Sequence, residues 1–169
     1  MPEAVRAGCA TDAARITADW YGRAVGVLFV KMSRQPLVVL SQDELLDDME
    51  FERLFLVLDG LVARAEPFGV LFIVGHGQRP PMERTLRQGQ WIKDNRDALQ
   101  EYCVAFGVVF TSPVIRFLLG TLALAQPFPM PWKTFSDARE GEDWVVALLQ
   151  RRGLRVPPPP SSFPPAPGD

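Results

Sequence analysis

The chain has 169 residues, about the length of one domain, and its 47% hydrophobic and 22% charged residues are typical of a globular protein. Its 18 basic and 20 acidic residues give a net charge of −2, which excludes a bulk attraction to nucleic acids. The two cysteines, Cys9 and Cys103, exclude a disulfide framework, and no closely spaced Cys/His set predicts a metal site.

Residues 1–21 mix acidic and basic side chains and contain no apolar core of a secretory signal. We expect them to form a partly ordered N-terminal segment before a domain at residues 22–155. The most apolar stretch, Val114–Ala125, includes Arg116 and is far shorter than the roughly 20 residues of a membrane span. It predicts a buried helix, with a membrane-dipping or partner-binding helix as alternatives. A cytoplasmic protein without a membrane span is expected.

Strands are predicted first at Ala24–Val30 and Leu37–Leu40, where short apolar runs are rich in β-branched residues. The short polar connection Lys31–Pro36 favours antiparallel pairing of the two strands. Gly69–Val74 and Val104–Thr111 are apolar almost without interruption. Such runs are typical of interior strands in a sheet that is covered on both faces.

The clearest helix is predicted over Ser41–Glu66. Ser41 and Glu44 have the spacing of a capping box, and Pro67 follows the expected end. The apolar residues recur at helical spacing and predict one buried stripe, which consists of Phe51, Leu54, Phe55, Leu58, Leu61 and Val62.

Two more helices are predicted in the centre of the chain. The first runs from about Pro81 to Cys103, and the second begins at Ser112, which precedes a proline, and stops before Pro127. The residues of the first helix expected to face inward are Leu86, Ile92, Leu99, Tyr102 and Cys103.

The run Pro127–Trp132 contains alternating prolines and predicts an extended segment. It leads to a short edge strand at Lys133–Phe135 and a last helix capped by Ser136 or Asp137. The inward residues of that helix are expected to be Trp144, Val145, Leu148 and Leu149.

Residues 156–169 hold seven of the 16 prolines and predict a flexible Pro-rich tail of polyproline II character. It is interpreted as an inert terminus, with a docking segment for another domain or subunit as the alternative.

These elements follow the order β-β-α-β-α-β-α-β-α. Alternating strands and helices predict a single α/β domain in which helices flank a mixed sheet.

Ligands of open α/β sheets bind at the carboxyl ends of the strands. Here that edge includes the loop from Gly75 to Pro81 with the only histidine, His76. No oriented nucleophile or carboxylate partner for His76 has a recognisable spacing, and no nucleotide-binding fingerprint or nucleophile elbow occurs. We therefore expect no catalytic, cofactor-binding or metal-binding residue and no enzyme, with a reaction at His76 as a distant alternative.

Charge is unevenly distributed. Six acidic residues fall within Ser41–Glu52, whereas five basic residues stand against two acidic ones across Arg79–Arg96. The two segments are interpreted as solvated helix faces or, alternatively, as complementary surfaces that favour self-association.

The chain resembles the STAS or SpoIIAA-like domains of anti-sigma-factor antagonists, in a divergent form that is also similar to the CRAL-TRIO lipid-binding fold. The resemblance covers about Ala24–Gly153. It lies in the strand, acidic helix and strand of Val25–Val74 and in the closing segment Phe135–Trp144. The antagonists carry a phosphorylatable Ser or Thr after the strand that corresponds to Gly69–Val74, where this chain has Gly-His-Gly-Gln.

The resemblance implies a non-catalytic regulatory or scaffold module that binds a protein partner through the strand-end loop and the adjoining helix. The expected partner-binding residues are Gly75, His76, Gly77, Gln78, Arg79, Arg84 and Arg87. One alternative is a carrier of a lipid or small apolar molecule, with Val114–Ala125 and Phe128–Trp132 lining a pocket. The other is a self-assembling structural subunit, in which acidic and basic helices of neighbouring copies meet.

Overall fold

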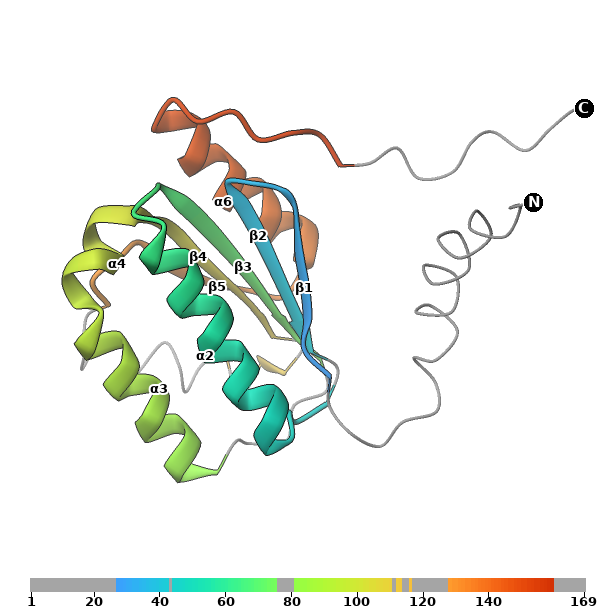
Figure 1. Ribbon diagram of the computed structural model, residues 1–169. Helices are drawn as coiled ribbons and strands as arrows, with labels where there is room; N and C mark the ends of the chain where they lie inside the picture. The colour runs from blue at the N-terminus through green and yellow to red at the C-terminus, as the bar shows by residue number, and fades with distance from the viewer. Residues whose placement is uncertain are drawn as a thin grey trace, which may run out of the picture.

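A computed structural model of the protein describes residues 27–42, 44–75, 81–110, 112–113, 116 and 128–159. Strands and helices alternate along most of this part of the chain (Figure 1). In order they are β1 (Phe29–Arg34), β2 (Leu37–Gln42), α2 (Asp48–Ala63), β3 (Phe68–Val74), α3 (Met82–Asp94), α4 (Arg96–Tyr102), β4 (Cys103–Phe110), β5 (Trp132–Phe135) and α6 (Ala138–Arg151).

The strands form one sheet in the order β1-β2-β3-β4-β5. The β1–β2 pair is antiparallel and the other three pairs are parallel, which confirms the predicted mixed sheet and its opening antiparallel pair. Val38 lies beside Val70, Val70 beside Phe106, and Phe106 beside Trp132. These side chains therefore form one row across the sheet.

Helices cover both faces of the sheet. In Figure 1, α2, α3 and α4 lie on the near face and α6 lies behind it. Val38 and Val70 belong to the core beneath α2 and α4, while Leu37 and Leu71 belong to the core beneath α6. Successive strand residues point to opposite faces, so a strand buried on both faces needs apolar residues throughout. This confirms the prediction of interior strands.

The opening strand differs from its prediction. Lys31–Pro36 was expected to connect two strands, but β1 continues to Arg34 and only Gln35 and Pro36 form the turn. Lys31 and Ser33 are exposed, whereas Met32 is partly buried. This alternation is that of an edge strand, which needs apolar residues on one face only. Residues 24–26 of the predicted strand lie outside the described part.

Helix α2 begins later than predicted. Ser41 is a residue of β2, where it lies between Phe29 and Ile73, so the predicted capping box at Ser41 is wrong. The cap is Asp47, whose carboxylate accepts a hydrogen bond from the Glu50 amide at 2.7 Å. The predicted apolar stripe is confirmed at its buried positions, Phe51, Leu54, Phe55 and Leu61.

The helix expected from Pro81 to Cys103 is two helices. The chain turns at Asn95, which has φ −103° and ψ 18°, and whose side-chain amide donates to the Trp91 carbonyl at 3.0 Å. Cys103 is the first residue of β4. Leu86, expected to face inward, is 66% exposed, because α3 directs Gln88, Trp91 and Ile92 towards the sheet instead.

Close contact between α6 and the sheet depends on glycine. A methyl group on Gly69 of β3 would lie 2.7 Å from Val145 Cγ1, and one on Gly141 of α6 would lie 2.8 Å from Leu71 Cδ1. Such distances are shorter than van der Waals contact, so these sites admit no side chain without displacement of a neighbour. Of the two caps predicted for α6, Ser136 and Asp137, the structure has Asp137, whose carboxylate accepts from the Glu140 amide at 3.0 Å.

The segment after α6 contacts the domain. Leu154 and Val156 pack against the core beneath α6, and Arg34 Nε donates to the Pro157 carbonyl at 2.8 Å. Arg34 also forms an ion pair with Glu142 of α6. The start of the Pro-rich segment is therefore attached to β1. Most of the expected flexible tail lies outside the described residues. Most of the helix predicted after Ser112 also lies outside them.

Candidate functional site

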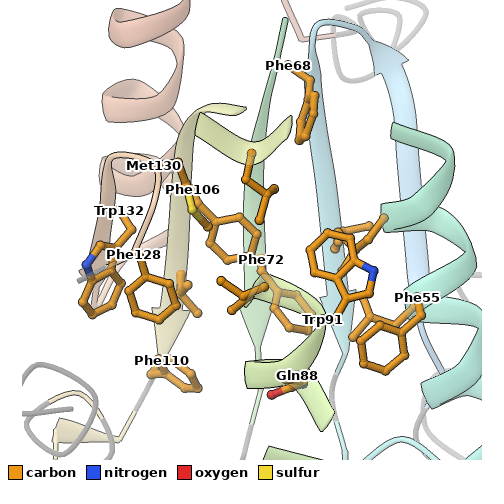
Figure 2. Close-up of a pocket in the computed structure, with 16 residues that line it drawn as sticks. Phe55, Phe68, Phe72, Gln88, Trp91, Phe106, Phe110, Phe128, Met130 and Trp132 are labelled. Carbon is orange, nitrogen blue, oxygen red and sulfur yellow. The ribbon is translucent and has the colours of Figure 1, made fainter. Parts of the chain in front are cut away.

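An apolar pocket of about 190 Å³ lies between the sheet and the helices on its near face. The strands supply its floor, α2 and α3 supply one wall, and the segment that leads into β5 supplies the other (Figure 2). Among the residues that line it, half are aromatic: Phe55, Phe68, Phe72, Trp91, Phe106, Phe110, Phe128 and Trp132.

The floor follows from the pairing of the parallel strands. Phe72 of β3 lies beside Leu40 of β2 and Val108 of β4. Phe106 and Phe110 are two positions before and after Val108, so all three point to the same face. Large side chains from three strands therefore meet on the face that α2 and α3 cover.

The first wall is formed where α2 and α3 lie side by side. Phe55 of α2 and Trp91 of α3 have ring centroids 6.3 Å apart. The indole Nε1 of Trp91 donates to Asp59 at 2.7 Å, which fixes the orientation of the ring. The polar edge of Trp91 is thus directed to the surface while its ring lines the pocket.

The second wall is the segment before β5. The rings of Phe128 and Trp132 lie 4.8 Å apart, and Met130 between them is buried. The Phe106 amide donates to the Pro131 carbonyl at 2.9 Å, which ties this segment to β4. Figure 2 shows Phe128 and Trp132 on the opposite side of the pocket from Trp91, with Phe106 between them.

Gln88 is the one polar residue among the described lining residues. It lies on α3 one turn before Trp91 and Ile92 and is half-buried. Its side-chain amide forms no hydrogen bond to any described residue. The amide therefore keeps both a donor and an acceptor for a molecule in the pocket.

Charged residues on the outer surface join the two helices of the first wall. Arg84 of α3 binds Asp48 at 2.6 Å and also the Leu46 carbonyl, and Arg87 forms a bidentate ion pair with Glu52. The Arg87 hydrogen bond lowers the pKa of Glu52 from its ordinary value, and the same bond raises the pKa of Arg87. The acidic and basic segments of the sequence therefore meet within one chain.

Two of the expected partner-binding residues take part in these ion pairs. Gly75 lies at the carboxyl end of β3, where its amide donates to the Gln42 carbonyl at 2.7 Å. Arg84 and Arg87 lie on α3 and point towards α2. His76, Gly77, Gln78 and Arg79 lie outside the described residues, so the structure does not show whether the expected set forms one surface.

The aromatic pocket was only partly anticipated. The sequence singled out Phe128–Trp132 as a pocket lining, but Gln88 and Trp91 were not recognised. The available signal was their spacing, because Gln88, Trp91 and Ile92 recur at i, i+3 and i+4, the pattern of one helix face.

Among the described residues, few reactive groups could form another site. Burial raises the pKa of the Cys103 thiol to about 12, so this residue is a protonated core side chain at neutral pH. No group of three or more His, Cys, Asp or Glu side chains with metal-binding proximity occurs within the described ranges. In the same part of the chain, no helix has the length and apolar character needed to cross a membrane.

The comparisons with known proteins identify the fold. No family model matches the chain, and no curated protein matches it. A solved structure from Shewanella loihica PV-4, an uncharacterized protein from the DUF3478 family with a SpoIIAA-like fold, is similar with a TM-score of 0.53 and 12% sequence identity. The match covers 72% of this chain and 94% of that one. The chain has a divergent SpoIIAA-like fold, as the resemblance implied.

Proposed function

We propose that this protein is a non-catalytic binding module and that the aromatic pocket is its site for a small apolar molecule. The observation that carries the proposal is the pocket itself, whose described lining is apolar apart from Gln88. A well-formed apolar pocket with very few polar groups is the first candidate for the ligand site of a domain.

The free energy of binding would come mainly from the hydrophobic effect. Water in such a pocket lacks the two to four hydrogen-bonding partners that an ordered buried water needs. An apolar molecule that replaces it gains about 25 cal/mol for each Å² of apolar surface removed from solvent. The pocket is therefore better suited to an apolar ligand than to water.

The lining also supports binding rather than chemistry. None of the described lining residues is an acid, a base or a nucleophile that titrates between pH 4 and 10. Acid–base or nucleophilic catalysis needs such a group within hydrogen-bonding distance of the substrate. We therefore keep the non-catalytic assignment as part of the proposal.

The proposal is tested with a neutral, environment-sensitive naphthalene dye, 6-propionyl-2-(dimethylamino)naphthalene, whose emission shifts to the blue and increases on transfer to an apolar site. The variant Ile92→Trp adds an indole to the pocket, and Leu148→Trp makes the same change on α6, across the sheet. We expect Ile92→Trp to weaken dye binding at least tenfold and Leu148→Trp to leave it unchanged, with folding of both checked by circular dichroism. Equal binding to both variants, or no binding to the unmodified protein, would contradict the proposal.

A second candidate is a regulatory or scaffold protein that acts through a protein partner, in the cytoplasm. The SpoIIAA-like fold supports it, and so do exposed apolar side chains on the outer helices, since Met49 and Leu56 of α2 are 74% and 71% exposed. These two residues lie seven positions apart and hence on one face of α2. The test compares proteins that copurify with the unmodified chain and with a Met49→Gln/Leu56→Gln variant. An unchanged set would remove this face from consideration.

A further inference from the structure

We infer that the ligand of the aromatic pocket is a neutral molecule of one or two fused aromatic rings that carries one hydrogen-bonding group, and that Gln88 binds this group. The inference rests on the proposed function, because it specifies what the same pocket binds. Four features support it: the volume of the pocket, its aromatic rings, the absence of charge among its described lining residues and the amide of Gln88.

The volume limits the size of the ligand. The pocket has a volume of about 190 Å³ and is partly open to solvent. An apolar cavity of roughly 150 Å³ in another protein holds benzene, whereas pockets for drug-sized molecules start at about 300 Å³. A molecule slightly larger than benzene therefore fits, and an extended long-chain lipid does not.

The aromatic rings of the lining favour a flat ligand. Phe55 and Trp91 form one side of the pocket and Phe128 and Trp132 the other, with Phe106 between them in Figure 2. Aromatic rings prefer offset stacking or edge-to-face contact at centroid distances of about 4.5–7 Å. A planar ring bound against either pair can make such contacts, whereas an alkyl chain gains only from the removal of its surface from water.

The absence of charged side chains among the described lining residues favours a neutral ligand. No described lining residue is Lys, Arg or His, so a carboxylate in the pocket would be buried without a counterion. Burial of an unpaired charge is far more costly than burial of a neutral polar group. The nearby cations do not compensate, because Arg84 and Arg87 are already paired with Asp48 and Glu52.

Gln88 explains why the ligand carries one polar group. Its amide forms no hydrogen bond to a described residue and is accessible to water, and Gln88 lines an otherwise apolar pocket. A hydroxyl or ring N–H on the ligand would bind the amide oxygen, and a carbonyl would bind the amide nitrogen. A ligand without such a group leaves the amide unpaired once water has been displaced.

The experiment compares four probes by isothermal titration calorimetry on the full chain. They are 1-naphthol and indole, which are neutral and have one donor, naphthalene, which has none, and palmitate, which is long and charged. We expect 1-naphthol and indole to bind, naphthalene to bind more weakly than 1-naphthol by about fivefold, and palmitate to give no saturable heat.

The variants test the role of Gln88. Gln88→Leu should abolish the preference for 1-naphthol over naphthalene without loss of naphthalene binding. Gln88→Glu should weaken the binding of 1-naphthol and of naphthalene at neutral pH. This variant provides a second test if Gln88→Leu does not fold. Gln150→Leu, the same substitution at an exposed position of α6, is the matched control and should leave all affinities unchanged.

The outcomes separate the inference from the proposed function. Palmitate binding tighter than 1-naphthol would overturn the inference while the apolar site remained supported. A preference for 1-naphthol that persists in Gln88→Leu would overturn the role of Gln88. Absence of binding by all four probes and by the neutral naphthalene dye would overturn the proposed function together with the inference.

Discussion

The guanidinium carbon of Arg87 lies 4.8 Å from the ring centroid of Phe55. Through its nitrogens the same guanidinium binds Glu52, which precedes Phe55 by about one helical turn. Arg87 therefore joins an ion pair on the outer surface to a ring that lines the pocket. Because α3 has no buried residue of its own, its attachment to α2 depends strongly on contacts of this kind.

Removal of the Arg87 charge should loosen α3. In Arg87→Gln we expect faster amide hydrogen exchange over Met82–Asp94, because both the ion pair and the contact with Phe55 are lost. Exchange in α6, across the sheet, should not change. The matched control is Arg139→Gln, an exposed arginine of α6 that has no ion pair with any described residue. Equal protection of α3 in all three proteins would refute this role.

The same pair predicts a dependence on pH. The hydrogen bond from Arg87 holds the pKa of Glu52 below its ordinary value of 4.5. A carboxyl group whose pKa is lower in the folded state stabilises that state fully above its ordinary pKa and loses this contribution as the pH falls through the lowered value. Protection of α3 should therefore decrease at acid pH, below about 4.5. A carbon-13 NMR titration should give a higher pKa for Glu52 in Arg87→Gln, and an identical pKa in both proteins would contradict the assignment.

Gly69 and Gly60 should respond to alanine in opposite directions. The added methyl of Gly69→Ala meets Val145 Cγ1 at 2.7 Å in a fully buried place, and overpacking of this kind costs about 1–3 kcal/mol. Gly60 has nothing within 4 Å of the new methyl and lies in α2, where alanine is favoured over glycine by up to about 1 kcal/mol. Urea denaturation measures both free energies of unfolding. A Gly69→Ala protein as stable as the unmodified one would disprove the close contact.

Arg34 should contribute to stability through β1, α6 and the segment after α6. Its side chain is 9% exposed and binds both Glu142 and the Pro157 carbonyl. Hydrogen bonds of charged groups contribute about 1.5–3 kcal/mol, so Arg34→Met should lower the free energy of unfolding by about that amount. Lys31→Met, at an exposed position of the same strand, is the control and should have little effect. Proteolysis should also cut near Pro157 faster in Arg34→Met, and an unchanged cleavage rate would count against this attachment.

Cys103 should be unreactive in the folded protein. Burial raises the pKa of its thiol to about 12, so almost no thiolate is present at pH 8. We expect iodoacetamide to leave Cys103 unmodified in buffer and to modify it in guanidinium chloride, as measured by peptide mass spectrometry, which distinguishes it from Cys9. Rapid modification in buffer would show that this end of β4 opens readily.

Local patterns were sufficient for most of the sheet and for its fold class. The runs at Gly69–Val74 and Val104–Thr111 are apolar on both faces, and each forms a strand within one residue of its predicted limits. The Asp137 cap was also recognisable, because a cap depends only on the next three residues. Where local patterns competed, the tertiary structure decided. Ser41 has the spacing of a cap but pairs in β2, since extension of that strand gives its backbone partners on both sides.

The sequence by itself determined the β-rich mixed sheet, its cover on both faces and the apolar stripe of α2, because each depends on periodicity within a few consecutive residues. Only the tertiary structure decided that Arg84 and Arg87 are paired within the chain and that aromatic side chains enclose a pocket. Those features join residues far apart in sequence, such as Asp59 and Trp91, which are 32 positions apart. Contacts of that range depend on which helices become neighbours and how each is rotated, which periodicity within one segment does not specify.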